Sequence, residues 1–126
     1  IGSRLVGSEM CIRDSYIKAQ KARRALSQKT YALMRSHSLD LLCYPGMMGD
    51  PPEIDKVGRY YYLDWPLITS PANLTGAPAA SVRVGYSVAN MPMSIQLTGK
   101  LFEDGKVLSA AHAYEMATPE FSKIME

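Results

Sequence analysis

The side chains that could perform nucleophilic or acid–base chemistry are few in this 126-residue sequence, and they are spread along it. Two histidines, His37 and His112, each fall in a segment with helical periodicity, where a lone histidine is usually a surface residue. Cys43 falls in an apolar run, which favours a small buried side chain over a nucleophile. The sequence contains no G-x-S-x-G, H-E-x-x-H, C-x-x-C or G-x-x-x-x-G-K-S/T pattern. Residue types alone therefore assign no catalytic residue.

Composition narrows the class of protein. Two cysteines supply neither a four-ligand zinc site nor a disulfide framework. Fourteen basic and twelve acidic side chains give a net charge of +2, which predicts no strong field for nucleic acid or anionic membranes. Apolar runs such as 41–44 are too short to span a bilayer. We expect a soluble, cytoplasmic α/β domain without a metal, a membrane contact or a nucleic-acid partner.

The first fifteen residues differ from the rest. They show neither a period of two nor one of 3.6, and they lack the apolar core of a signal peptide. The run 5–14 looks like a translated sequencing-library adapter joined to a truncated transcript, and a native N-terminal extension is the alternative. We therefore expect two units, namely a non-native segment over residues 1–15 and a functional unit over residues 16–126.

Helical periodicity dominates residues 16–38. The apolar stripe of this predicted helix consists of Ala19, Ala22, Leu26, Thr30 and Leu33. The same segment carries six basic and no acidic side chains, which would suit a nucleic-acid surface. No matching basic excess follows downstream, so we favour a solvated helix face.

A buried strand is predicted next, over residues 39–44, and a long irregular stretch runs from Pro45 to about Pro66. Irregular stretches of this length are usually lids or binding loops. Four aromatic residues gather near its end, at Tyr60, Tyr61, Tyr62 and Trp65. They could line an apolar pocket, or they could cap the core or a subunit contact, and the sequence leaves both open.

In the remaining segment, residues 70–118, proline and glycine mark the expected ends of helices and strands. A short helix is predicted after Ser70, with Pro71 in its first turn and Gly76 at its end. Two strands follow, over residues 79–84 and 93–98, and their alternating apolar positions predict an antiparallel pair. A last helix over residues 104–118 is expected to bury Val107, Leu108, Ala111 and Tyr114.

Three blocks of this segment resemble the C-terminal portion of the amidase signature family. They are NLTGAPAASVRVG within residues 69–85, MPMSIQLTG at 91–99 and FEDGKVLSAAHAYE at 102–115. The resemblance extends over residues 16–126. It implies a fragment of an α/β domain, with a mixed β-sheet flanked by helices.

The family hydrolyses amide bonds, or transfers the released ammonia, with a serine nucleophile, a serine on a cis peptide and a lysine. The resemblance places these residues upstream of the portion present in this chain, and it implies no metal and no organic cofactor. We therefore expect the chain to be inactive alone, with a small-molecule amide as the substrate of the full-length enzyme. Homo-oligomerisation stays open.

The resemblance also implies which residues of this sequence would line the substrate pocket. Some family members hold the ammonium group of an amino-acid amide with an aspartate shortly before the asparagine–glycine block, and Asp64 occupies roughly that place. Capping of the turn before Trp65 is the alternative for this aspartate. With Tyr62 and Trp65, Asp64 forms the predicted substrate-binding set. The alternative function is a non-catalytic binding or scaffold domain that kept only the C-terminal blocks.

Overall fold

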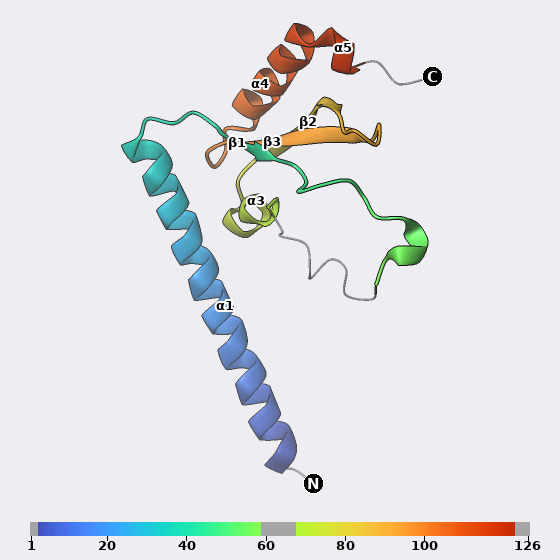
Figure 1. The fold of residues 1–126 in the computed structure, drawn as a ribbon. Coiled ribbons are helices and arrows are strands. Elements are labelled where there is room, and N and C mark those ends of the chain that lie inside the picture. Colours follow the sequence, from blue (N-terminus) through green and yellow to red (C-terminus); the bar gives the residue numbers. More distant parts are fainter. Residues whose placement is uncertain (1–2, 59–67, 123–126) are drawn as a thin grey trace.

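Helix α1, Ser3–Ser36, is the longest element of the chain (Figure 1). The computed structural model describes the backbone of residues 3–58 and 68–122, with the side chains of residues 12–58 and 68–121. The helix contains no proline and a single glycine, so nothing in its sequence interrupts the hydrogen-bond ladder. It passes residue 15 without a break, and the assignment of residues 1–15 to a non-native segment stays a prediction.

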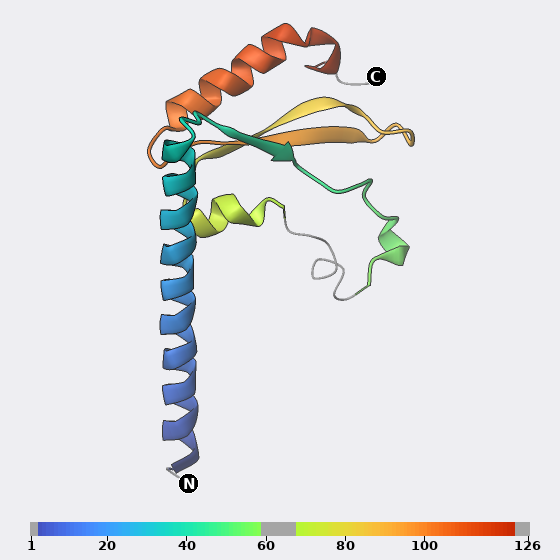
Figure 2. The ribbon, with the colours of Figure 1, turned by 60° about the vertical axis from the view of Figure 1, so that its left-hand side comes forward.

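The contacts of α1 involve its C-terminal half. Met34 is fully buried, and Thr30 and Tyr31 are half-buried. Burial raises the pKa of the Tyr31 hydroxyl. In Figures 1 and 2 the N-terminal half of the helix extends away from the sheet.

The predicted apolar stripe of this helix was wrong except at Thr30, because its other four members are exposed: Ala19, Ala22, Leu26 and Leu33. The reason is that α1 meets the short helix α3, Ser70–Thr75, partly through polar groups. Arg23 Nε donates to the carbonyl oxygen of Leu74 at 2.8 Å. Ser27 Oγ donates to the carbonyl oxygen of Thr75 at 3.2 Å.

Proline and glycine mark the ends of helix α3, as the sequence predicted. Pro71 lies in its first turn, and Gly76 ends it with a left-handed φ of 73°. Its N-cap is Thr69, one residue before the predicted cap, and no side chain caps the helix there. Thr75 Oγ1 instead donates to the carbonyl oxygen of Pro71 at 2.7 Å.

Three strands form an antiparallel sheet in the order β1-β3-β2. They are β1 (Leu42–Pro45), β2 (Ala79–Tyr86) and β3 (Pro92–Thr98). The predicted pairing of the last two strands is confirmed, with Val82 opposite Ile95. A mixed sheet was expected, but both strand pairs in the described part of the chain are antiparallel.

The hydrophobic core lies between the sheet and helix α4, Asp104–Ala117. Val82, Leu97, Val107 and Ala111 form its buried centre. The prediction was right for Val107 and Ala111 and wrong for Leu108, which is 64% exposed because it lies on the outer side of the helix. A last turn of helix, α5 (Pro119–Ser122), follows.

The described elements make three layers (Figure 2). Helix α4 covers one face of the sheet, and α3 lies on the other side beside α1. The segment between β1 and α3 leaves the sheet and includes a short 3₁₀ helix, η1 (Ile54–Lys56).

Candidate functional site

No catalytic constellation is formed by the residues that the structure describes. His37 and His112 are exposed and lie on separate elements. Cys43 is also exposed, which corrects the expectation of a buried thiol: β1 is an edge strand, and the side chain of Cys43 is not covered. Within residues 3–58 and 68–122, no group of three or more histidine, cysteine or carboxylate side chains could hold a metal ion.

Serine hydroxyls that form hydrogen bonds in the structure have structural roles. Ser27 and Ser36 donate to main-chain carbonyl oxygens, and Ser87 accepts from the N–H of Met91. A nucleophilic serine needs a base within hydrogen-bond reach. The side-chain hydrogen bonds found in the described part of the chain include none from a serine to a histidine, lysine or carboxylate.

The predicted substrate-binding residues Asp64, Tyr62 and Trp65 lie outside the described residues. Their contribution to a pocket therefore stays a prediction. The same holds for Tyr60 and Tyr61 of the aromatic cluster.

A cavity of about 580 Å³ opens where β1 ends and the β2–β3 hairpin turns. Its apolar lining comes from three separate segments and includes Met47, Met48, Val84, Val88, Met93 and Ile95. Gly46 holds the first of these segments against β3, since its N–H donates to the carbonyl oxygen of Ser94 at 2.8 Å. A Cβ at position 46 would collide with Ser94 Oγ and lie 3.2 Å from the Ser94 carbonyl oxygen, so the close approach favours glycine.

The sequence did not identify this cavity. Alternation along β3 did place Met93 and Ile95 on one face of that strand. Residues 47–50 line the cavity because the chain after β1 runs beside β3. No local sequence pattern predicts that course of the chain. We shall call the cavity with its lining the hairpin cavity.

A polar network lies on the sheet face opposite to α4. The hydroxyls of Tyr44 and Thr98 are 2.8 Å apart, and Gln96 Nε2 donates to Tyr44 Oη at 3.0 Å. Gln96 and Thr98 are buried, at 8% and 3% exposure, although the sequence placed them on the polar side of their strand. Mutual hydrogen bonds make this burial tolerable. The network joins β1 to β3.

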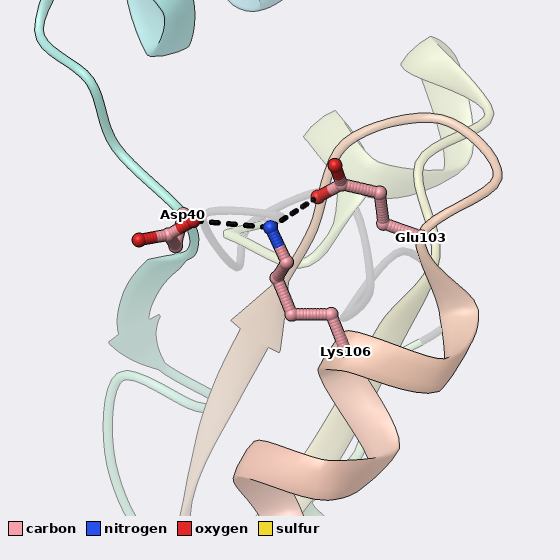
Figure 3. Close-up of polar contacts among 3 residues, drawn as sticks. All are labelled: Asp40, Glu103 and Lys106. Atoms are coloured by element: carbon pink, nitrogen blue, oxygen red, sulfur yellow. Dashed lines mark hydrogen bonds and ion pairs between the residues drawn. The ribbon is translucent and has the colours of Figure 1, made fainter.

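Figure 3 shows a second polar cluster, at the start of α4. Lys106 Nζ lies 3.0 Å from Asp40 Oδ1 and 3.1 Å from Glu103 Oε2. The hydrogen bond from Lys106 lowers the pKa of Asp40, and the hydrogen bond to Asp40 is the main cause of the raised pKa of Lys106. The cluster ties the segment before β1 to α4, with one ammonium group between two carboxylates.

None of the helices in the described ranges is long and apolar enough to cross a bilayer.

Comparisons with known proteins agree on one family. The family model described as Amidase matches residues 4–108. The A subunit of glutamyl-tRNA(Gln) amidotransferase from Pseudothermotoga lettingae is 36% identical over 105 residues, which are 81% of this chain and 21% of that protein. The corresponding protein of Synechococcus sp. is 34% identical over 114 residues, 85% of this chain and 22% of that protein.

A solved structure extends the likeness to the fold. The crystal structure of the A subunit of glutamyl-tRNA(Gln) amidotransferase from Thermotoga maritima superimposes with a TM-score of 0.72 at 30% identity. The match covers 92% of this chain and 26% of that chain. The chain thus spans about a fifth to a quarter of the length of these relatives. Its family match and its fold together show that the chain belongs to the amidase signature family.

Proposed function

We propose that this chain is the C-terminal part of an amidase domain whose complete form breaks carbon–nitrogen amide bonds. The observation that carries the proposal is the match of residues 4–108 to the amidase model, on a chain that covers only 21% of a similar protein. The described residues bring no serine nucleophile and base together, so the chemistry requires residues from elsewhere. The chain alone is inactive.

The family resemblance supplies the mechanism of the complete enzyme. A neutral lysine accepts a proton through the bridging serine on the cis peptide while the nucleophilic serine attacks the amide carbonyl. Main-chain N–H groups stabilise the developing oxyanion, ammonia or an amine leaves, and water releases the acyl group. Transfer of the ammonia to a second substrate is the variant that the name of the relatives, amidotransferase, indicates.

This chain contributes the sheet and its supporting helices. Asp64, Tyr62 and Trp65 are the residues we assign to substrate binding, on the sequence argument given above. In the complete enzyme an amide small molecule is the substrate, no metal or organic cofactor is needed, the location is cytoplasmic and the sheet is mixed.

A chimera tests the proposal. Residues 16–126 replace the matching segment in the Thermotoga maritima relative, and ammonia release from glutamine and from simple primary amides is measured. We expect amide hydrolysis above that of the same relative with the segment deleted. A chimera that unfolds cooperatively but shows only the deletion's background would contradict the proposal.

The purified full chain is the matched control. We expect it to release no ammonia above buffer from the same amides. Hydrolysis by the chain alone would show that it carries its own nucleophile and base.

Sequencing the genomic locus upstream of the codon for Tyr16 tests the boundary at residue 15. We expect a reading frame that continues into a glycine- and serine-rich segment, with a lysine codon before it and no codons for residues 1–15. A start codon followed by codons for residues 1–15 would favour the non-catalytic binding domain instead.

A further inference from the structure

The chain exposes more surface than a compact protein of its mass. Its solvent-accessible surface is 9734 Å². A compact monomer of 13.9 kDa exposes roughly 6,700 Å². In the described part of the chain, six apolar side chains are buried, namely Met34, Ala72, Val82, Leu97, Val107 and Ala111. A large surface over a small core is what a piece of a larger domain shows.

Several of the large exposed apolar side chains gather at the hairpin cavity. Met47, Met48 and Met93 line it and are 51%, 59% and 45% exposed. Val88, between β2 and β3, also lines it and is fully exposed. Asp50 is the one charged residue among the described residues that line the cavity. A contiguous group of exposed apolar side chains indicates an interaction surface, and the flexible thioether of methionine adapts to varied apolar partners.

The outer side of α4 has a different character. Leu108 is 64% exposed there, but Asp104 and His112 lie one helical turn before and after it and are exposed as well. Met116 is 68% exposed, and the adjacent Glu115 is also exposed. Single apolar side chains among charged and polar ones are ordinary on a surface that faces water.

The comparison with the solved structure shows how much protein is available to cover the hairpin cavity. The match covers 92% of this chain and 26% of the Thermotoga maritima chain. Most residues of such a protein therefore lie outside the segment that this chain matches. A larger domain also buries a larger share of its surface. The rest of the same domain is thus an occupant of sufficient size for the cavity.

We propose that apolar side chains from the rest of the amidase domain fill the hairpin cavity in the complete enzyme, whereas the outer side of α4 stays on the surface of the domain. This inference rests on the proposed function, and it names the face through which the chain joins the complete enzyme. Burial of the methionine side chains supplies the attraction.

Oxidation by hydrogen peroxide tests the inference, because it converts an accessible methionine thioether to the sulfoxide. Mass spectrometry gives the rate at each methionine in the full chain and in the chimera that carries residues 16–126. We expect Met47, Met48 and Met93 to react about fivefold or more slower in the chimera. Met116 should react at the same rate in both, within about twofold. Met34, which is fully buried, should stay protected in both and reports that each protein is folded.

Three results would overturn the inference. In a folded chimera, the cavity methionines would react as fast as in the full chain, or Met116 would become protected with them. In the full chain alone, protection of the cavity methionines that grows with protein concentration would show that a second copy fills the cavity.

A second measurement uses the full chain alone and does not depend on the folding of the chimera. The dye 8-anilinonaphthalene-1-sulfonate becomes fluorescent on exposed apolar surface. Met48→Glu places a charge in the hairpin cavity and should weaken dye binding about tenfold. Met116→Glu adds the same charge on α4 and should change the affinity by no more than about twofold. Equal binding by the two variants would overturn the inference, because the cavity would then not be an open apolar face.

The inference and the proposed function fail separately. A chimera that protects the cavity methionines but releases no ammonia would overturn the proposed function alone. An active chimera whose cavity methionines react as fast as those of the full chain would overturn this inference alone.

Discussion

Lys106 is a residue at which separate parts of the chain meet. Its amine pairs with Asp40, which precedes β1, and with Glu103, which precedes α4 (Figure 3). The lowered pKa of Asp40 means that its contribution to stability is present above its unfolded-state pKa and is lost as the pH falls through the folded value. The raised pKa of Lys106 means that its contribution is lost only as the pH rises through the folded value. The pair of Lys106 and Asp40 is therefore intact from about pH 5 to about pH 9.

Replacing Lys106 by glutamine should raise the pKa of Asp40, because the hydrogen bond and the charge that stabilise the carboxylate are removed. A carboxyl ¹³C NMR titration of the full chain measures this pKa. Lys100→Gln is the matched control, since Lys100 acts on Asp40 only through weaker charge attraction. An equal rise in both variants would show that the hydrogen bond in Figure 3 does not control this carboxyl group.

Gly99 is required for close packing rather than for its φ angle. A Cβ at this position would lie 2.5 Å from Val107 Cγ2, and Val107 is 2% exposed. Gly99→Ala should therefore destabilise the chain by about 1–3 kcal/mol through overpacking. Urea denaturation followed by circular dichroism measures the change. Gly105→Ala is the control, because a Cβ there meets nothing and alanine suits a helix. It should be neutral or stabilising by up to about 1 kcal/mol.

At the scale of elements, α4 is oriented by adjacent residues with opposite environments. Val107 is buried against the sheet, and Leu108 is 64% exposed. Val107→Ala should cost about 2 kcal/mol of unfolding free energy. Leu108→Ala should cost no more than about 0.5 kcal/mol. Equal losses in urea denaturation would show that α4 packs with another face toward the sheet.

The elements that the sequence could predict are those whose signals are local. Pro71 and Gly76 mark the start and end of α3, and alternation marks the β2–β3 pair, as the structure confirms. The buried face of α1 could not be predicted, because it depends on which side meets α3. The burial of Gln96 was missed for a related reason, since its hydrogen-bond partner Tyr44 lies on the neighbouring strand β1 but is 52 residues away in the sequence.

For the candidate site too, some features could be predicted from the sequence and others could not. The absence of a nucleophile–base pair from this chain was expected from the sequence and stays a prediction. Family membership was also readable, from the three blocks between residues 69 and 115. The hairpin cavity was not, because residues 46–50 reach it only through the three-stranded arrangement. The roles of Asp64, Tyr62 and Trp65 stay predictions.

At the scale of the whole molecule, residues 12–15 of α1 contribute little to the fold. The described side chains of residues 12–15 are exposed, with Ile12 at 69%. A chain that begins at Tyr16 should therefore unfold within about 0.5 kcal/mol of the full chain. A chain that begins at Gln28 should lose about 1 kcal/mol or more, because the bonds from Arg23 and Ser27 to α3 disappear.

Urea denaturation of the three chain lengths checks this ranking. A large loss on removing residues 1–15 alone would argue that the segment is part of the native fold.

The strand order has a consequence for the time course of folding. β3 is central, and its two neighbours lie at very different distances along the chain. The contact of β3 with β2 closes through the turn at Ser87–Asn90, whereas Tyr44 and Thr98 are separated by 54 residues. Closing the longer loop costs about 2 kcal/mol more in chain entropy. The hairpin therefore forms first and β1 joins late.

Stopped-flow kinetics would register that sequence of events. Asn90 holds a left-handed φ of 62° in the hairpin turn, so Asn90→Ala should mainly slow refolding. Tyr44→Phe removes hydrogen bonds of the late strand and should mainly accelerate unfolding. A chain with this topology passes through a period in which the hairpin and α4 are assembled while the β1 side of β3 is still open to any strand that meets it.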